Sequence, residues 1–288
     1  MFYRPCLQVL LLLSLSPPCA AKLVEEILDL PVSAKNLYGK AVSQSIKVTV
    51  FRDDEKDRAP FLVLSHGRPA TTAEFAAMGR MRYAANASYF VGKGFAVLVP
   101  TRIGYGVSGG EDIEYAGNCA ARSYPASFGA AAQQVVQVVE YARSLPYVDA
   151  AKGVVVGQSY GGATSIALAA EGLSGVIAAI NFSGGGGGDP VGRPGSPCRP
   201  DLLEAVFSSY GQRARIPTLW LYSTNDKYFG EKYPKQWFDA FIRSGGQGEF
   251  VQLPPLLPPL GEDGHATFVR NPAAWRPAFE AFLTRVGL

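Results

Sequence analysis

The sequence predicts one domain of the α/β class, with a mostly parallel central sheet that helices cover on both faces. Short apolar runs rich in β-branched residues alternate along the chain with longer stretches at helical spacing, which is typical of parallel sheets. The 288 residues are 48% hydrophobic, which is enough to bury a large core. No linker or internal repeat divides the chain, so we expect a single domain.

The apolar runs are the expected strands of this sheet. Each is short and is bounded by glycine, proline or polar residues, as is usual for strands. The run 46–51 alternates in polarity, whereas 153–156 is apolar throughout. The expected strands cover residues 46–51, 60–64, 95–99, 153–156, 176–182, 217–222 and 249–253. We therefore expect a sheet of about seven to eight strands.

Helical periodicity recurs between these strands. Val135, Val139 and Ala142 share one helical face, and Pro146 then ends the helix. The expected helices cover residues 80–91, 129–145, 160–170, 233–243 and 274–285. Glycine-rich and proline-rich stretches are expected to form loops, at 100–110, 184–188 and 254–259.

The first 21 residues have the layout of a secretory signal peptide. Arg4 precedes an apolar run at 7–15, two prolines follow, and small residues lead to Ala21. We expect cleavage after Ala21, export to the periplasm or the extracellular space, and one α/β domain over residues 22–288. The apolar run is too short for a transmembrane anchor, which needs about 20 apolar residues. A lipid anchor at Cys19 is disfavoured by the prolines before it.

Export determines how the cysteines are interpreted. Cys6 and Cys19 lie in the expected signal peptide, so Cys119 and Cys198 remain in the mature chain. Two cysteines in an oxidising compartment usually pair, which predicts a Cys119–Cys198 disulfide. Two free buried thiols are the alternative. The number and spacing of the cysteines do not favour a zinc site.

Charge and histidine content exclude several classes of function. The net charge is only +3, and no run of Lys or Arg exceeds two residues, so we expect no nucleic-acid partner. The chain has two histidines, His66 and His265, which argues against a multi-histidine metal site. A G-x-G-x-x-G pattern at 104–109 has no helix starting at it, so a dinucleotide site is disfavoured. We expect neither a metal nor a cofactor.

A G-x-S-x-G pattern at 157–161 places Ser159 between an expected strand and an expected helix. This is the context of a nucleophile elbow, a turn so sharp that side chains flanking the serine would clash. The pattern occurs again at 106–110 around Ser108, but no helix follows there. We therefore predict that Ser159 is a nucleophile and that Ser108 is an ordinary loop residue.

A serine nucleophile needs a general base, which in turn needs an acid to orient it. In this arrangement the chain order is serine, acid, histidine, so His265 is the predicted base. As an isolated residue it would be interpreted as a histidine of a surface loop. His66 precedes Ser159 and is expected to shape a turn instead.

The predicted acid is Asp226, because it lies in the short segment that follows the expected strand 217–222. Asp189 in the glycine tract and Asp239 in a helix are the competing carboxylates. Glu262 and Asp263 lie too close in sequence to His265 to be its usual partner, although either could replace a displaced acid.

The tetrahedral intermediate needs hydrogen-bond donors where negative charge develops. We predict one donor in the backbone N–H of Tyr160, the residue after the nucleophile. The second should come from the loop after the strand 60–64. Arg68 is the choice there, since Gly67 forms the turn and Pro69 has no N–H. The alternative is that this loop is a plain turn and Arg68 a solvated charge.

Aromatic and histidine side chains are candidates for the substrate cleft. His66, Tyr105 and Tyr228 are the main candidates. Equally, loop aromatics could line the cleft or cover the sheet edge: Tyr105, Tyr115, Tyr124, Tyr228 and Phe229. Cys119 and Cys198 lie in loops expected on the same side of the sheet, so their disulfide is expected to tie the cleft walls together.

With these segments in order, the sequence resembles the α/β-hydrolase superfamily, in its dienelactone hydrolase-like branch. The segments are LSHG at 64–67, RIGYGVS at 102–108, YVD at 147–149, VVVGQSYGG at 154–162, ND at 225–226 and DGH at 263–265. The resemblance implies the α/β-hydrolase fold with Ser159 as nucleophile, Asp226 as acid and His265 as base. Enzymes that define the branch use a cysteine nucleophile on small cyclic lactones. Ser159 at this position favours esters over lactones.

The predicted function is that of an exported serine hydrolase that cleaves small carboxylic esters through an acyl-enzyme. A peptidase of the prolyl-oligopeptidase type shares the catalytic layout, but such enzymes usually carry a separate gating domain for which this chain has no room. A third alternative is a non-catalytic binding protein of the same fold. The acyl and alcohol parts of the substrate and the oligomeric state do not follow from the sequence.

Overall fold

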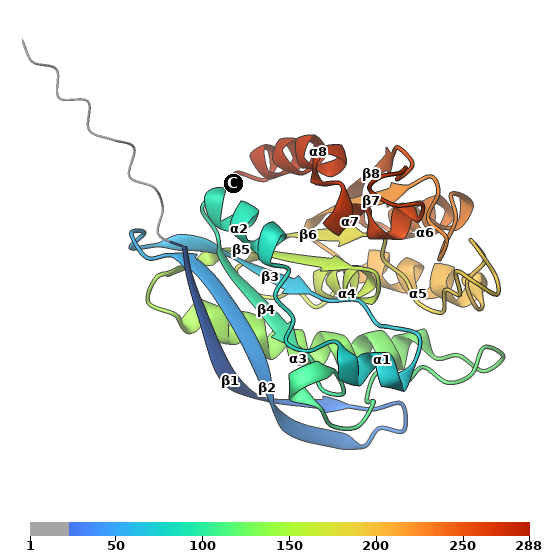
Figure 1. Cartoon of the computed structure of the whole chain (residues 1–288), viewed down its shortest axis with the longest axis horizontal. Helices are drawn as coiled ribbons and strands as arrows, with labels where there is room; N and C mark the ends of the chain where they lie inside the picture. Colours follow the sequence, from blue (N-terminus) through green and yellow to red (C-terminus); the bar gives the residue numbers. More distant parts are fainter. Residues whose placement is uncertain (1–22) are drawn as a thin grey trace, which may run out of the picture.

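A computed structural model describes residues 23–288 of the protein (Figure 1). The predicted signal peptide and its cleavage after Ala21 lie outside the described residues. The described chain forms one eight-stranded sheet in the order β1-β2-β4-β3-β5-β6-β7-β8. Strands β3 to β8 run parallel, whereas β2 pairs antiparallel with both β1 and β4. The predicted α/β class with a mostly parallel sheet is confirmed.

Strands β2 to β8 overlap the seven apolar runs of the sequence. Their bounds are β1 Leu23–Lys35, β2 Ala41–Asp53, β3 Ala59–Ser65, β4 Ala96–Thr101, β5 Val148–Gln158, β6 Val176–Phe182, β7 Pro217–Ser223 and β8 Gln247–Leu253. The central strands are buried on both faces because helices cover both sides.

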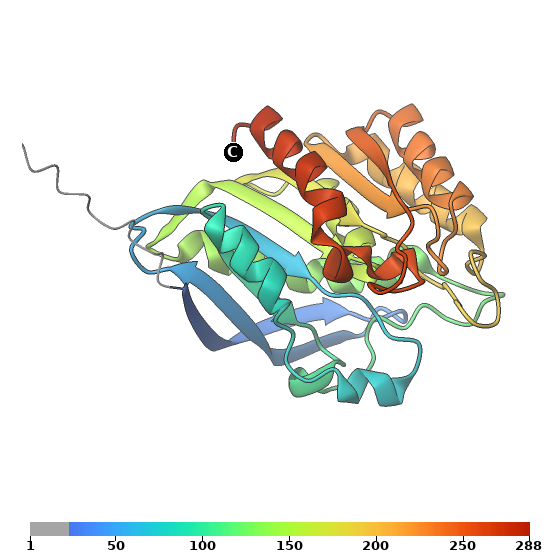
Figure 2. The same cartoon turned by 45° about the horizontal axis from the view of Figure 1, so that its top comes forward.

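Helices pack on the two faces of the sheet in two groups. Their bounds are α1 Thr72–Ala77, α2 Ala84–Gly92, α3 Tyr124–Ser144, α4 Tyr160–Ala169, α5 Pro200–Arg213, α6 Lys232–Arg243, α7 Thr267–Arg270 and α8 Pro272–Arg285, with 3-10 turns η1 Gly106–Ser108 and η2 Gly264–Ala266. One hydrophobic core joins the sheet to α3, α4, α5 and α6. A second core joins the other face to α2, α7 and α8 (Figure 2).

Strand β1 was not predicted, and its composition explains why. Glu25, Glu26 and Asp29 interrupt its apolar residues, and most of its side chains are exposed or half-buried. It is an edge strand that pairs with β2 over its full length. An edge strand buries little apolar surface, so β1 lacks the apolar run by which the other strands are recognised.

The helix predicted at 80–91 begins later, at Ala84. The N–H of Met81 donates to Thr101 Oγ1 at 2.9 Å, and Thr49 Oγ1 donates to the Met81 carbonyl at 2.9 Å. These contacts with β2 and β4 hold the segment extended, and Tyr83 then turns the chain with φ of 45°. Hydrogen bonds to the sheet outweigh the local preference for helix here.

Helices α1 and α5 were also missed. In α5, Leu203, Val206, Phe207 and Tyr210 are buried at helical spacing, so the periodic signal was present in the sequence. Helix α1 has only six residues, which is too short for such a signal to show.

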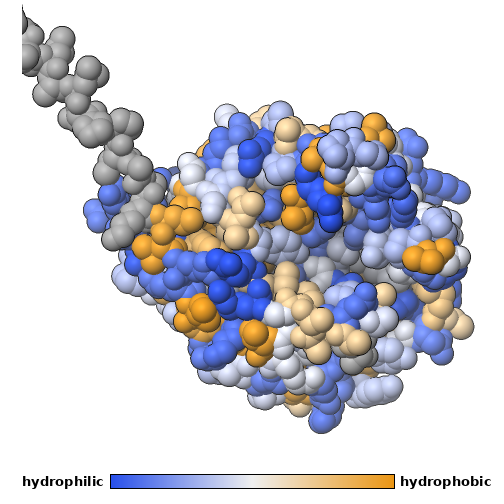
Figure 3. Space-filling view, in the orientation of Figure 1, coloured by the Kyte–Doolittle hydropathy of each residue, from blue (hydrophilic) through white to orange (hydrophobic). Residues whose placement is uncertain are grey.

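None of the helices in residues 23–288 is long and apolar enough to cross a bilayer. Hydrophobic residues are scattered in small groups over a mostly hydrophilic face (Figure 3). The loops that follow the parallel strands meet at the carboxyl edge of the sheet, which is where sites form in this architecture.

Candidate active site

Ser159 occupies a sharp turn between β5 and α4, as predicted. Its φ of 57° and ψ of −123° lie in a region that a non-glycine residue adopts only under strain, at a cost of about 1–3 kcal/mol. The flanking glycines make the turn possible. A Cβ at Gly157 would lie 2.0 Å from the Gly161 carbonyl oxygen, and one at Gly161 would lie 2.2 Å from the Ser65 carbonyl oxygen. Any larger residue at either position would force the turn open.

The second serine in a G-x-S-x-G pattern lies in a different setting. Ser108 belongs to the 3-10 turn η1, where its Oγ donates to the Thr101 carbonyl and accepts the N–H of Lys47 at 3.0 Å. Both contacts hold the loop against β2 and β4. The prediction that Ser108 is a loop residue is confirmed.

Asp226 and His265 are joined by a hydrogen bond. Asp226 follows β7 and its carboxylate is completely buried. Its Oδ1 accepts the backbone N–H groups of Tyr228 at 2.8 Å and Phe229 at 3.1 Å, and its Oδ2 lies 3.0 Å from His265 Nδ1. An ionised carboxylate only accepts, so Nδ1 of His265 carries the proton and Nε2 is left as the basic atom.

The loop that carries His265 is tied to the turn at Ser159. Gln158, the residue before Ser159, donates from Nε2 to the His265 carbonyl at 3.1 Å. The imidazole of His265 stacks on Tyr228 with ring centroids 4.0 Å apart and meets the edge of Phe229 at 5.3 Å. The structure therefore brings Ser159, Asp226 and His265 to one part of the carboxyl edge. Ser159 Oγ forms no hydrogen bond with another residue in the described range.

The competing carboxylates lie elsewhere or act differently. Asp189 pairs with Arg193, and Asp239 pairs with Lys235 on α6. Asp263 accepts the backbone N–H of His265 at 3.0 Å and so caps η2. Among the described residues, the hydrogen-bond partner of the His265 imidazole is Asp226.

The predicted oxyanion donors lie beside the nucleophile. Tyr160 is the first residue of α4, and the first N–H groups of a helix lack intrahelical acceptors. Gly67 packs so closely that a Cβ on it would lie 3.0 Å from Ser159 Cβ. The backbone from His66 to Arg68 therefore passes against Ser159, and within residues 23–288 no acceptor is bound to the Arg68 N–H.

The Arg68 side chain is an anchor rather than a solvated charge. Its guanidinium forms two hydrogen bonds with Asp112, at 2.7 and 2.5 Å, and donates to Tyr105 Oη at 2.9 Å. It also lies over the ring of Phe75, 4.5 Å from its centroid. Burial opposes the charge, but the hydrogen bonds to Asp112 raise the pKa of Arg68 above its ordinary value.

Two of the three cleft candidates are corrected by the structure. His66 and Tyr105 are fully buried. Both belong to a polar cluster that joins the inner side of the loop at 66–68 to the residues beneath it. His66 Nε2 accepts the N–H of Arg102 at 3.2 Å, and its Nδ1 lies 2.7 Å from the Gly67 carbonyl. Burial, and then the charge of Arg102, lower the pKa of His66 well below 6.5. His66 is therefore a neutral structural residue.

Ser159 lines a cleft of about 500 Å³ together with Tyr228. The glycine tract 185–188 forms part of its wall, and Arg68, Arg122 and Arg193 also line the cleft. Its aromatic residues are Tyr115, Tyr124, Tyr160, Tyr228 and Phe229. Of the five loop aromatics proposed for the cleft, only Tyr105 lies away from it.

The predicted disulfide joins Cys119 and Cys198 in the structure. It links the loop after β4 to the loop after β6, and Cys198 itself lines the cleft. Arg193 donates to both sulfurs, at 3.3 and 3.0 Å. The disulfide thus joins two walls of the cleft, in keeping with the role expected from the sequence.

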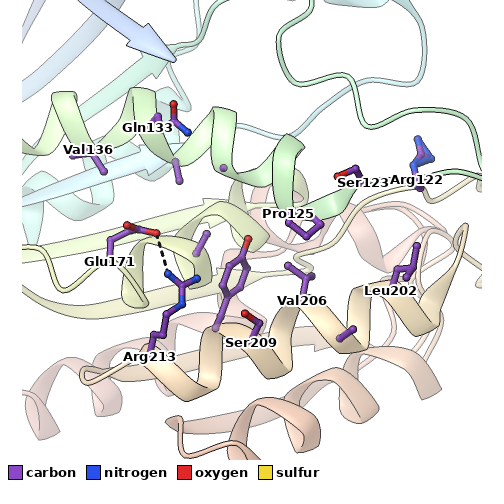
Figure 4. Close-up of a pocket in the computed structure, with 15 residues that line it drawn as sticks. Arg122, Ser123, Pro125, Gln133, Val136, Glu171, Leu202, Val206, Ser209 and Arg213 are labelled. Atoms are coloured by element: carbon purple, nitrogen blue, oxygen red, sulfur yellow. Dashed lines mark ion pairs between the residues drawn. The ribbon is translucent and has the colours of Figure 1, made fainter. Parts of the chain in front are cut away.

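A second cavity lies away from this chemistry. It measures about 430 Å³ and lies between α3 and α5 (Figure 4). Its lining includes the apolar residues Val136, Leu202 and Val206, with an ion pair of Arg213 and Glu171 at 3.7 Å. Neither histidine lines it, and its one carboxylate, Glu171, is paired with Arg213. No group of three or more potential metal ligands occurs among residues 23–288.

The comparisons identify the class of the protein. Residues 62–286 match the sequence profile of the alpha/beta hydrolase family, so the chain belongs to that family. A search of curated proteins found no match. The eight-stranded mixed sheet, with helices on both faces, agrees with this assignment.

Solved structures of hydrolases share the fold. A protein described as a dienelactone hydrolase from Klebsiella pneumoniae has a TM-score of 0.56 at 14% identity, over 91% of this chain and 98% of its own. An acetyl xylan esterase from Paenibacillus sp. R4 has a TM-score of 0.54 at 16% identity, over 92% and 88%. These likenesses show the fold and agree with the predicted resemblance to dienelactone hydrolase-like proteins.

A peptidase has the same fold over part of its length. The acylaminoacyl peptidase of Pyrococcus horikoshii has a TM-score of 0.54 at 12% identity over 90% of this chain. The match spans only 41% of that peptidase. The structural neighbours are thus hydrolases of both the esterase and the peptidase kinds.

Sequence reasoning missed the buried residues that support the site. Arg102 and Glu114 form an ion pair with no exposed side-chain surface, and Gln158 holds the His265 loop. A charged residue three positions after the end of the apolar run 95–99 was the one available signal for Arg102. Nothing in the sequence around Glu114 marks it as buried.

The glycine requirement predicts a sharp contrast between two substitutions. Gly161→Ala places a Cβ against the backbone of Ser65, so it should lower the free energy of unfolding by about 1–3 kcal/mol and distort the turn. Gly92→Ala on α2 meets nothing within 4 Å and should be neutral or slightly stabilising. Urea denaturation of both variants measures this. Equal stability of the two would contradict the proposed packing.

The lowered pKa of His66 predicts a dependence of stability on pH. Unfolded chains take up a proton at this residue below pH 6.5, whereas the folded protein keeps it neutral, so stability is lost as pH falls. The contribution reaches about 1.4 kcal/mol per pH unit. His66→Gln should remove this slope between pH 6.5 and 5, measured by urea denaturation. Parallel pH curves for the variant and the wild type would show that His66 is not buried neutral.

Proposed function

We propose that the protein is an exported serine hydrolase that cleaves carboxylic esters through an acyl-enzyme on Ser159. The observation that carries this proposal is the hydrogen bond of the buried Asp226 carboxylate to His265 Nδ1, at 3.0 Å, beside the strained turn of Ser159. A buried acid, a histidine whose Nδ1 faces that acid and a half-buried serine that lines the cleft are the three parts that nucleophilic catalysis needs.

His265 serves as the general base in this mechanism. Its Nε2 takes the proton of Ser159 Oγ as the oxygen attacks the ester carbonyl carbon, and then gives that proton to the leaving alkoxide. Asp226 holds the tautomer and stabilises the imidazolium that forms between these steps. The two N–H groups that fix Asp226 Oδ1 keep its carboxylate aimed at the ring. Water then attacks the acyl-enzyme by the same route.

Negative charge on the substrate oxygen is stabilised by the backbone N–H groups of Tyr160 and Arg68. Both lie next to Ser159, since Tyr160 follows it in the chain and Gly67 packs on its Cβ. The N-terminus of α4 adds the positive end of the helix dipole at the same point. Donors held in place before the reaction need no reorganisation when charge develops.

Export is part of the same proposal. A disulfide between Cys119 and Cys198 suits an oxidising compartment. A chain of this kind would meet its ester substrates in the periplasm or outside the cell. The disulfide would stay oxidised there and would keep the cleft walls together.

A peptidase is the second candidate, because an acylaminoacyl peptidase shares the fold. The same groups could attack an amide, although an amine is a poorer leaving group than an alkoxide. A substrate panel separates the two: nitrophenyl esters of increasing acyl length, acetylated sugars and a peptide nitroanilide. The proposal expects ester turnover to exceed nitroanilide turnover.

Substitution of the two motif serines tests the nucleophile. Ser159→Ala should abolish labelling by a fluorophosphonate probe and lower ester turnover at least about 10³-fold. Ser108→Ala removes the serine of the other G-x-S-x-G pattern and should keep both. Labelling is measured by intact-protein mass spectrometry and turnover by nitrophenolate release. Turnover that survives in Ser159→Ala would exclude the mechanism, and a wild-type protein that neither reacts nor turns over would favour a non-catalytic binding protein.

A further inference from the structure

A fully buried ion pair lies beneath the loop that carries Arg68. Arg102 Nε donates to Glu114 Oε1 at 2.6 Å, and Arg102 Nη2 donates to Glu114 Oε2 at 3.1 Å. Neither side chain has any exposed surface. Burial opposes the charge of Arg102, and the Glu114 carboxylate nevertheless raises the pKa of that guanidinium. Such pairs seldom add net stability over apolar residues of the same shape. The residues that Arg102 and Glu114 contact point to another role for the pair.

Arg102 also donates hydrogen bonds to the loop at 66–68. Its Nη1 donates to the His66 carbonyl at 2.9 Å, and its backbone N–H donates to His66 Nε2 at 3.2 Å. His66 Nδ1 in turn bonds the Gly67 carbonyl at 2.7 Å. These contacts fix His66 and Gly67, the two residues that directly precede Arg68.

Glu114 reaches the same loop by a second route. Tyr105 Oη donates to Glu114 Oε2 at 2.7 Å and accepts from Arg68 Nη1 at 2.9 Å. The Tyr105 ring packs edge-on against His66, with centroids 4.7 Å apart. The hydroxyl of Tyr105 thus joins the buried carboxylate to the side chain of Arg68.

The residue after the nucleophile is bound to Glu114 as well. Tyr160 Oη donates to the Glu114 carbonyl at 3.3 Å, and Ser127 Oγ bonds the same carbonyl. Gln134 fixes the cluster from α3, since its Oε1 accepts the Ile103 N–H at 2.8 Å. Glu114 is therefore bound to both residues whose N–H groups are the proposed oxyanion donors, Arg68 through Tyr105 and Tyr160 directly.

We propose that Glu114, acting through Tyr105 and Arg102, is a positioning residue that sets the distance between the N–H groups of Arg68 and Tyr160. This inference rests on the proposed function. Glu114 touches no substrate. Its carboxylate holds the loop at 66–68 and its carbonyl holds Tyr160, so one residue aligns two donors that come from loops after different strands. Transition-state stabilisation depends on that alignment more than substrate binding does.

The test uses Tyr105→Phe, which keeps the ring and removes only the bridging hydroxyl. Glu114→Gln is the more direct variant, but it would leave Arg102 without its counter-charge in the core and could unfold the protein. Tyr89→Phe is the matched control, because Tyr89 Oη donates to a carboxylate, Glu280, at 2.7 Å between α2 and α8. Both changes break one Tyr–Glu hydrogen bond, and Tyr105→Phe also removes the hydroxyl that accepts from Arg68 Nη1.

The measurement compares 4-nitrophenyl acetate with its thiono counterpart, which has C=S in place of C=O. Sulfur is a weaker acceptor and is larger, so the thionoester gains less from aligned N–H donors. Tyr105→Phe should lower kcat on the oxo ester about 10-fold, with KM within twofold and the oxo-to-thiono rate ratio reduced by a similar factor. Tyr89→Phe should leave the ratio unchanged. Thermal unfolding midpoints of both variants are recorded alongside.

The outcomes separate this inference from the function on which it rests. An unchanged oxo-to-thiono ratio in Tyr105→Phe overturns the positioning role, and the serine mechanism stands if Ser159→Ala is still inactive. A loss in kcat that affects both esters equally also overturns it, because a general structural defect does not distinguish oxygen from sulfur. A ratio that falls in Tyr105→Phe and not in Tyr89→Phe supports it.

Discussion

The backbone of Ser159 is the constraint on which the carboxyl edge of the sheet depends. A serine at φ 57° can be held only if the residues two positions before and after it have no side chain. A Cβ at Gly157 would lie 2.0 Å from the Gly161 carbonyl oxygen, and a Cβ at Gly161 would lie 2.2 Å from the Ser65 carbonyl oxygen. That closeness brings β3 and the loop after it against Ser159. The strained turn therefore brings the serine, the start of α4 and the loop at 66–68 close together.

The carboxylates of Asp226 and Glu114 are both buried and hydrogen-bonded. Asp226 accepts two backbone N–H groups and the His265 ring, and the Arg102–Glu114 pair is surrounded by its own set of partners. An unpaired charge in either place would be costly. In the proposed mechanism the two clusters have different tasks: Asp226 orients the base, and the Arg102–Glu114 pair supports the loop that faces the developing charge. The disulfide of Cys119 and Cys198 acts at the cleft wall, farther from the nucleophile.

The sequence was informative where local chemistry demands particular residues. The turn at Ser159 needs glycines at fixed positions, Asp226 lies just past the end of an apolar strand, and His265 is the one histidine after Ser159. These three residues could therefore be proposed from the sequence. Partners that depend on distant segments could not. Arg102 and Glu114 meet only through tertiary packing, and His66 and Tyr105 are adjacent to cleft residues yet buried beneath them. The edge strand β1 was missed because it buries little apolar surface.

In the proposed mechanism, attack by Ser159 creates a tetrahedral oxyanion between the N–H groups of Tyr160 and Arg68. A crystal structure of the protein after reaction with a fluorophosphonate tests it most directly, since the phosphonyl oxygen takes the place of the oxyanion. We expect phosphorus on Ser159 Oγ and the phosphonyl oxygen about 2.7–3.1 Å from both backbone nitrogens. A phosphonyl oxygen that points into solvent, or an adduct on any other residue, would contradict the claim.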